Sequence, residues 1–285
     1  MDNVLMFEFC IDGKFLSIYC GILEDNHFAY AFFDGKSASR KFLRGECRLF
    51  KYQFQALENI FTPERLRFSL YGEVGISCDI KITNHSKFQS NRGLANILPR
   101  NVHIEFISQL SEFVGEVTIN GKTYQVNDWG YIHRISTKRL PDRFYALNLL
   151  GDNVCLASYM ASNAIWIYNF DSFLTAGTIG GQYYRFADYN LSTISVIDDG
   201  NHLLVKLQKG KTELNLCAEC GNEQFIKYNN RIIRANNYTK ADVVLNVGNK
   251  QVYKGSVSAS LLINGKIKVG KDVETSKFCE ASVLN

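Results

Sequence analysis

The amino-acid sequence predicts an all-β fold, built from antiparallel β-barrel or sandwich units with little helix. Short segments rich in β-branched and aromatic residues, bounded by turn residues, carry this prediction, because such residues pack well on a pleated sheet. Representative segments are residues 15–19, 116–119, 203–207 and 258–263. The 15 tyrosines and 20 phenylalanines of the chain also suit sheets better than helices.

Turn signals recur along the chain. Asn120-Gly121 and Asn264-Gly265 each stand between Ile and Lys, and Asn-Gly tolerates the positive φ angles of a type I′ hairpin turn. Similar signals lie at Asp12-Gly13, Asp34-Gly35, Gly180-Gly181 and Asp199-Gly200. Turns at this spacing favour sandwiches or barrels over βαβ units. Helical pattern is thin, and residues 53–60 form either a short helix or a connecting turn.

The length of 285 residues suits one large domain or two of ordinary size. The two Ile-Asn-Gly-Lys turns lie half the chain apart, which hints at two similar β-units. We therefore expect an N-terminal unit over residues 1–125 and a C-terminal unit over residues 126–285. We expect the two units to meet between residues 110 and 140.

Composition narrows the partners and the compartment. The net charge of +4, from 32 basic and 28 acidic residues, is too balanced to indicate a nucleic-acid partner. No run of about 18 apolar residues predicts a membrane-spanning segment, although peripheral contact with a membrane stays open. The N-terminus lacks the basic region and apolar run of a signal peptide, so we expect a cytoplasmic protein with free thiols. The oligomeric state is not predicted.

Motifs for metals and cofactors are missing. The sequence has no phosphate loop, no Gly-x-Gly-x-x-Gly, no nucleophile elbow and no His-Glu-x-x-His. Cys217 and Cys220 have the spacing of metal ligands, but a zinc site needs a second pair of ligands. We therefore expect no cofactor and no metal.

The segment 127–148 gathers residue types that suit acid–base catalysis. It holds a carboxylate, a phenol, an imidazole and a guanidinium, from Asp128, Tyr131, His133 and Arg143. Such groups catalyse proton transfer when a dry pocket shifts their pKa values. The alternative interpretation is structural: Asp128 starts a turn, the aromatic residues of the segment pack in the core, and the polar rings lie at its rim.

The same segment resembles the tocopherol cyclase family and its bacterial relatives. In that family an Asn-Gly hairpin leads into an acidic or amide residue followed by Trp-Gly, then Phe-Pro, and then a Trp-rich strand. These motifs stand here as residues 119–122, Asp128-Trp129-Gly130, Leu140-Pro141 and residues 144–148, with further likeness at residues 16–22, 28–33 and 180–189. Phe7-Glu8-Phe9 corresponds to the family's opening motif, roughly Phe-Glu-Gly-Trp-Tyr.

The resemblance implies two lipocalin-like β-units that enclose an apolar small molecule. It also implies a cofactor-free cyclase or isomerase that acts on a prenylated or polyketide-like substrate. On this hypothesis Asp128 is the acid, while Tyr131, His133 and Arg143 relay protons or hold a polar head group. The substrate-binding residues would be Trp129, Phe144, Tyr145, Asn148 and Trp166.

A second function is left open by three residues of the aromatic strand. Where the family carries Trp, Gln and Asn, this chain has Ala146, Asn148 and Leu150. Loss of polar groups from the expected cavity favours a non-catalytic carrier of a hydrophobic ligand. A third reading is a purely structural or interaction role, in which the interior is packed and has no cavity.

Overall fold

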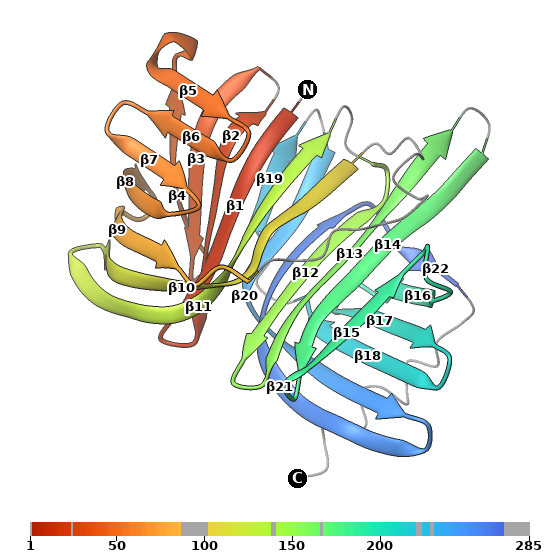
Figure 1. Ribbon diagram of the computed structural model, residues 1–285. Helices are drawn as coiled ribbons and strands as arrows, with labels where there is room; N and C mark the ends of the chain where they lie inside the picture. Colours follow the sequence, from red (N-terminus) through yellow and green to blue (C-terminus); the bar gives the residue numbers. More distant parts are fainter. Residues whose placement is uncertain are drawn as a thin grey trace. The chain divides into compact units, whose positions relative to one another are not determined.

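A computed structural model of the chain describes residues 2–23, 25–86, 102–137, 141–165, 168–220, 224–228 and 231–270. Within these ranges the chain is almost entirely β-strand (Figure 1). The described ranges contain one 3₁₀ turn, η1 (Arg44–Glu46), and no α-helix. The predicted all-β fold class is confirmed.

The described chain divides into two compact units, each with one 11-stranded antiparallel sheet. Unit 1 holds the described residues up to 137, and unit 2 holds those from 141 onward. The chain therefore passes from one unit to the other at the end of the interval 110–140. The expected boundary after residue 125 falls inside strand β11 (Lys122–Thr137), all of which belongs to unit 1.

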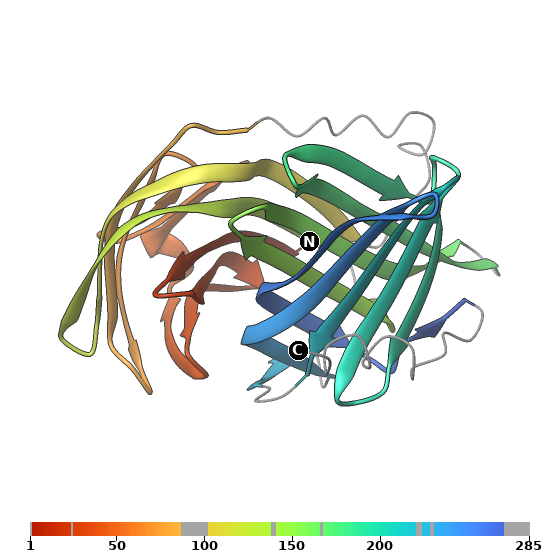
Figure 2. The same cartoon turned by 90° about the horizontal axis from the view of Figure 1, so that it is seen from below.

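Unit 1 is a closed barrel with a three-strand extension. Its other strands are β1 (Asp2–Ile11), β2 (Lys14–Leu23), β3 (Asn26–Phe33), β4 (Lys36–Phe42), β5 (Cys47–Phe50), β6 (Gln53–Ala56), β7 (Asn59–Thr62), β8 (Arg65–Gly72), β9 (Ile76–Thr83) and β10 (Val102–Ile119). The strand order is β4-β3-β2-β1-β11-β10-β9-β8-β7-β6-β5, and a β4–β8 pairing closes the first eight into a barrel. Figure 2 shows β10 and β11 as long, curved strands.

Side chains fill the core of unit 1. The rings of Phe9 and Phe113 stack with centroids 4.7 Å apart. A second row of rings runs from β4 through the extension to β8, with centroids 5.3–6.0 Å apart: Phe42, Phe54, Phe61 and Phe68. The extension β5–β7 is thus packed onto the core by its own aromatic side chains.

Unit 2 is an open, curved sheet. Its strands are β12 (Phe144–Gly151), β13 (Val154–Ile165), β14 (Tyr168–Ile179), β15 (Gln182–Ala187), β16 (Thr193–Asp198), β17 (His202–Lys209), β18 (Thr212–Glu219), β19 (Gln224–Tyr228), β20 (Arg231–Val247), β21 (Lys250–Asn264) and β22 (Lys268–Val269). The order is β15-β14-β13-β12-β21-β20-β18-β17-β16-β22, and β19 pairs with β20. Its core is mostly Leu, Val and Ile.

Several predicted hairpin turns are present. Asn120 and Gly121 have φ angles of 48° and 82° and join β10 to β11, as a type I′ turn requires. Gly180 and Gly181, with φ angles of 59° and 76°, join β14 to β15. The predictions at Asp12-Gly13 and Asp34-Gly35 are likewise confirmed.

Two local predictions are corrected. Asn264 does not open a two-residue hairpin: it pairs with both Phe144 and Ile233 in the sheet, and its side-chain amide donates to the carbonyl of Pro141 at 2.6 Å. The helical alternative for residues 53–60 is also wrong. These residues form β6, a turn at Leu57-Glu58, and the start of β7. This hairpin places Phe54 of β6 and Phe61 of β7 together in the core, which stabilises strands over a helix here.

Several strands are buried on both faces, among them β1, β2, β12 and β13. In β1, every residue from 5 to 11 is buried, and the same holds for residues 15–21 of β2 and 144–150 of β12. Alternate side chains of a strand point to opposite faces. In each of these strands, one set of alternate side chains lies in the core of its unit. We call the opposite side of the strand, which carries the other set of side chains, the second face.

Candidate functional site

The second face of unit 1 carries a group of buried polar side chains. On β1, Leu5, Phe7, Phe9 and Ile11 belong to the core, so Glu8 lies on the second face with 1% of its surface exposed. We define the Glu8 cluster as Glu8, Ser17 and Tyr19 with Tyr131 and His133, all 9% exposed or less. The cluster lies on three adjacent strands, β2, β1 and β11.

Hydroxyl groups from β2 solvate the carboxylate of Glu8. The Ser17 hydroxyl donates to Glu8 Oε1 at 2.8 Å, and the Tyr19 hydroxyl donates to the same oxygen at 3.4 Å. Ser17 is directly opposite Glu8 in the β1–β2 ladder. A buried carboxylate is costly without such donors, and donors of this kind stabilise its charged form.

The other neighbours of Glu8 come from β11. Tyr131 is directly opposite Glu8 in the β1–β11 ladder, and His133 is opposite Met6. The rings of Tyr131 and His133 lie with centroids 5.4 Å apart. Phe106 of β10 meets the His133 ring edge-on at 4.6 Å. The carboxylate therefore lies beside aromatic rings as well as hydroxyl groups.

Gly130 explains part of the Trp-Gly motif. A Cβ atom at Gly130 would lie 2.3 Å from the carbonyl oxygen of Glu8 and 2.8 Å from both Phe9 and Phe113. Only glycine allows β11 to approach β1 this closely. The motif thus positions the backbone that carries Tyr131 and His133 against the backbone of Glu8.

An irregularity in β10 lies opposite the same stretch of β11. The β10–β11 register shifts between Phe106 and Ser108 and again between Ser108 and Ser111. Bulges re-aim side chains and are common beside functional sites. Ser108 and Ser111 are fully buried, and their hydroxyls bond to the Leu110 carbonyl at 2.9 Å and to His85 Nδ1 at 2.8 Å.

Burial changes the acid–base behaviour of this region. It lowers the pKa of His133 to about 3, so the imidazole is neutral near pH 7. Burial, together with the negative charges of Asp128 and Glu8, raises the pKa of Cys10 to about 12. The Cys10 thiol therefore stays protonated and is not a nucleophile under ordinary conditions.

The structure separates Asp128 from the two rings with which it was grouped. Asp128 is opposite Phe113, a core residue, while Tyr131 and His133 are on the other face of β11. Its carboxylate is half-buried, and Oδ1 accepts the Trp129 backbone N–H at 2.7 Å. Trp129 itself is 42% exposed.

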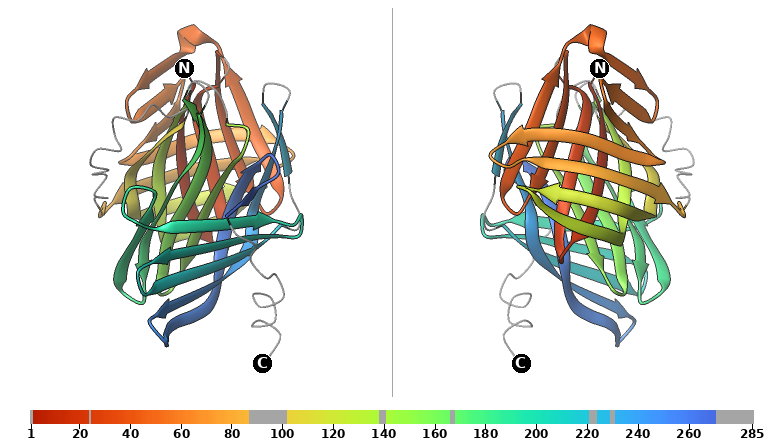
Figure 3. Two further views of the ribbon diagram at one scale, coloured as in Figure 1. Left: turned by 90° about the vertical axis from the view of Figure 1, so that its right-hand side faces the viewer. Right: turned by 90° about the vertical axis from the view of Figure 1, so that its left-hand side faces the viewer.

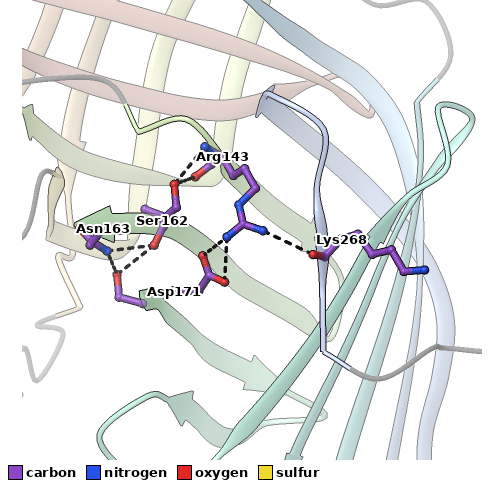
Figure 4. A network of polar contacts seen from close by, with 7 residues as sticks. Arg143, Ser162, Asn163, Asp171 and Lys268 are labelled. Atoms are coloured by element: carbon purple, nitrogen blue, oxygen red, sulfur yellow. Dashed lines mark hydrogen bonds and ion pairs between the residues drawn. The ribbon is translucent and has the colours of Figure 1, made fainter. Parts of the chain in front are cut away.

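Arg143 precedes β12 of unit 2 and takes part in an ion pair (Figure 4). Its Nη2 lies 3.1 Å from Asp171 Oδ1 and 3.3 Å from Oδ2, and its Nη1 donates to the carbonyl of Lys268 at 3.5 Å. The guanidinium therefore links β14 to β22. Ser162 accepts the Arg143 backbone N–H at 3.1 Å, which fixes the start of β12.

The predicted substrate-binding residues of β12 lie on both of its faces. Tyr145 is in the core of unit 2, where its hydroxyl bonds to Ser158 at 2.9 Å, and Ser158 bonds to Thr175 at 2.7 Å. Phe144 and Asn148 lie on the second face and are buried. The last predicted residue, Trp166, lies outside the described residues.

Asn148 is the polar centre of the second face of unit 2. Its Oδ1 accepts the Tyr159 hydroxyl at 2.8 Å, and both side chains are at most 3% exposed. Further along the face, the Asn163 amide donates to Ser172 at 2.7 Å (Figure 4). These groups are amides and hydroxyls, which donate and accept hydrogen bonds but carry no charge near pH 7.

An open groove of about 690 Å³ lies at the turns of unit 2. The residues that line it are Gln208, Gly210, Lys211, Glu213, Asn246, Gly248 and Asn249. The lining is polar and none of the predicted site residues contributes to it. An apolar ligand would gain little from this groove, because ligand pockets for such molecules are mostly apolar.

Over the residues that the structure describes, no group of three or more His, Cys, Asp or Glu side chains could hold a metal ion. Seven cysteines in this part of the chain are free thiols, and six of them are buried. No helix in the described ranges is long and apolar enough to cross a membrane.

Sequence reasoning missed Glu8 as a site residue, although a signal was present. From Val4 to Ile11, Glu8 is the single polar residue in an otherwise apolar run. Ser17 in β2 and Asn148 in β12 interrupt apolar runs in the same way. A lone polar residue in a strand buried on both faces must lie in a desolvated environment, which favours a functional or strongly bonded group.

Comparison with known proteins supports the fold. No protein-family model matches the chain, and no curated protein matches it. Among solved structures, CghA with Sch210972 is 7% identical, with a TM-score of 0.59 over 94% of this chain and 89% of CghA. A putative AttH from Nitrosomonas europaea is 10% identical, with a TM-score of 0.54 over 93% of this chain and 92% of its own. At these identities the likeness concerns the fold alone, and it shows that the chain has a lipocalin-like fold.

Proposed function

We propose that the protein is a cofactor-free enzyme that acts on an apolar small molecule by acid–base chemistry, with Glu8 as the group that transfers the proton. The observation that carries this proposal is a carboxylate 1% exposed on the second face of β1, beside a serine, two tyrosines and a histidine. A carboxylate shielded from water is the usual means of protonating a weak base.

The neighbours of Glu8 have complementary roles in this proposal. Ser17 and Tyr19 donate hydrogen bonds to Oε1, so they stabilise the carboxylate that remains after the proton has left. His133, neutral because of its low pKa, can donate or accept a hydrogen bond but does not supply a cationic acid. The rings of Tyr131 and Phe106 would stabilise a developing carbocation.

The finer reaction class comes from the resemblance to tocopherol cyclases. That resemblance implies protonation of a prenyl double bond followed by ring closure, on a prenylated or polyketide-like substrate. Glu8 lies in Phe7-Glu8-Phe9, which corresponds to the opening motif of that family. The shared fold with CghA, solved with Sch210972, supports a ligand-binding role for this architecture.

A carrier remains the second candidate, and the second face of unit 2 favours it. Asn148 is already hydrogen-bonded to Tyr159, and the face holds neutral groups. Phe144 and Asn148 would then contact the ligand without chemistry. A cytoplasmic location belongs to either proposal, and a thiol titration of the unfolded protein should then count close to the eight cysteines of the chain.

Paired substitutions test the assignment of Glu8. A panel of prenylated hydroquinones and linear polyenes would be incubated with the protein, and products with the mass of the substrate would be separated by chromatography. Glu8→Gln keeps the shape of the side chain but removes the acid, so turnover should fall about 10²-fold or more. Binding of a lipophilic fluorescent probe should change much less.

Asp128→Asn is the matched control, because it removes the other candidate acid. It should leave turnover within a few fold of the wild type. Loss of turnover in Asp128→Asn with normal turnover in Glu8→Gln would transfer the role to Asp128. Probe binding by the wild type without turnover of any panel member would support the carrier.

A further inference from the structure

An exposed surface that combines apolar and basic side chains lies at one end of unit 1. We call residues 40–58 the basic flap; they comprise the end of β4, the η1 turn, β5, β6 and the following turn. Figure 3 shows η1 at the tip of unit 1, in orange, with the short strands beside it. Leu43, Phe50 and Leu57 in this flap are 73%, 56% and 51% exposed. Apolar side chains grouped in this way mark interaction surfaces.

The charge of the basic flap is strongly positive. Five basic residues, Arg40, Lys41, Arg44, Arg48 and Lys51, stand against two acidic ones, Glu46 and Glu58, which gives a net charge of +3. The whole chain has a net charge of only +4. Lys41, Arg44 and Arg48 are exposed, and Arg48 shares the outer face of β5 with Phe50.

The two acidic residues of the flap are bonded to the flap itself. Glu46 accepts the backbone N–H of Leu43 at 2.9 Å, and Glu58 accepts Arg40 Nη1 at 3.1 Å. Both carboxylates therefore lie against neighbouring groups of the flap. An approaching surface would therefore meet mainly the positive charges of the exposed basic side chains.

Leu57 has an uncommon backbone conformation. Its φ angle is 53°, a left-handed conformation that bulky side chains rarely adopt, and the turn would suit Asn or Gly better. Half of its side chain is nevertheless exposed to water. Leu191 of unit 2 has a similar conformation and is also exposed, so this geometry alone assigns no role. Leu57 differs from Leu191 in that it belongs to a segment that also carries exposed apolar and basic side chains.

The flap is held firmly on the barrel, so its apolar residues are not those of a frayed segment. Phe54 is packed in the core, and the Tyr52 hydroxyl donates to Glu105 of β10 at 2.5 Å. Glu105 also lies 3.6 Å from Lys51 and 3.3 Å from Arg134. The outward residues are thus presented by a fixed scaffold.

We propose that the basic flap docks onto the surface of an anionic lipid bilayer. Leu43, Phe50 and Leu57 would insert among the acyl chains near the headgroups, and the arginine and lysine side chains would contact the lipid phosphates. Exposed apolar side chains favour a bilayer over nucleic acid, which offers phosphates but no apolar phase. The inference does not depend on the proposed enzymatic function, and its test needs no substrate.

Vesicle co-sedimentation of the full chain tests this proposal. Vesicles of phosphatidylcholine with about 30% phosphatidylglycerol should bind the protein at least tenfold more strongly than pure phosphatidylcholine, and high salt should reduce the difference. Arg44→Glu with Arg48→Glu should lower binding to the anionic vesicles about tenfold or more. Leu57→Asn should lower it about tenfold, through the loss of one inserted side chain.

Leu191→Asn in unit 2 is the matched control for Leu57→Asn. Leu191 is 95% exposed and has a φ angle of 61°, so both changes place Asn where a left-handed turn residue is favoured and neither should impair folding. Leu191→Asn should bind the vesicles as the wild type does. Equal binding to neutral and anionic vesicles, no binding, or unchanged binding by the flap variants would overturn the proposal.

Discussion

The second faces of the two units differ in one chemical respect. In unit 1 the buried polar residue of the central strand is Glu8, a carboxylate that receives hydroxyl donors from β2. In unit 2 the corresponding residue is Asn148, an amide that receives the hydroxyl of Tyr159. Both faces are buried to a similar degree, so the two differ in the type of polar group, an ionisable acid against an amide, and not in exposure.

This difference bears on the task that each unit could perform. A buried carboxylate can give or take a proton, whereas an amide can only orient a partner through hydrogen bonds. If the proposal holds, unit 1 supplies chemistry and unit 2 supplies uncharged hydrogen-bonding groups. Substitutions that compare the two faces directly test this division.

The largest expected effect is a pH dependence of stability that originates in unit 1. His133 has a folded pKa of about 3 against roughly 6.5 when unfolded, so the unfolded chain binds more protons between these values. The stability from neutral His133 is complete above pH 6.5 and is lost as the pH falls towards 3. At pH 4 the loss should be roughly 3 kcal/mol.

Urea denaturation at pH 7 and pH 4 measures this loss. His133→Gln should reduce the difference between the two pH values by that amount, whereas Tyr159→Phe in unit 2 should keep the wild-type difference. An identical pH dependence in His133→Gln and the wild type would show that the imidazole is not protected from protonation.

The next effect in size is the loss of stability when a buried hydrogen bond is removed. It compares the bond accepted by the Glu8 carboxyl group with the bond accepted by the Asn148 amide. Ser17→Ala removes the 2.8 Å donor to the Glu8 carboxylate, and Tyr159→Phe removes the 2.8 Å donor to the Asn148 amide. Bonds to charged groups contribute about 1.5–3 kcal/mol and neutral ones about 1 kcal/mol. Thermal unfolding at high pH, where Glu8 has lost its proton, should therefore rank Ser17→Ala as the more destabilising change. At low pH, where Glu8 holds the proton that the proposed function assigns to it, the two changes should cost about the same.

The smallest effect concerns Arg143, which the sequence predicts as a catalytic residue. Its ion pair with Asp171 is partly exposed, with 37% and 21% of the two side chains accessible, so Arg143→Gln should cost at most about 1 kcal/mol. Asp171→Asn should cost about the same, and the double variant little more than either alone. A loss well above this in Arg143→Gln but not in Asp171→Asn would indicate another role for the guanidinium.

The sequence predicted the strands and hairpins of this fold well, because alternation and turn chemistry are local. Asn120-Gly121 and Gly180-Gly181 form the predicted turns with the required φ angles. Asn264-Gly265 did not, because Asn264 is bonded to Pro141, far away in the sequence. Closure of the barrel through Ala38–Gly72 and Ser39–Tyr71 is likewise a long-range pairing that no local pattern indicates.

The candidate site was predicted only in part, for a geometric reason. Tyr131 and His133 share a face of β11, but Asp128 lies three residues before Tyr131 and therefore points to the other face. The carboxylate that lies beside the two rings is Glu8, which becomes their neighbour through the β1–β11 pairing. That pairing joins the two ends of unit 1 and could not be read from the segment 127–148.

The same pairing has a consequence for synthesis on the ribosome. Asp2 is opposite Thr137, so β1 is made well before β11 and receives this neighbour only when unit 1 is almost complete. At about 5–20 residues per second, this interval is on the order of ten seconds. During this time β1 can pair with β2, but its other edge is left without a strand neighbour and is open to aggregation. Slowing translation after residue 23 should therefore increase aggregation of the nascent chain.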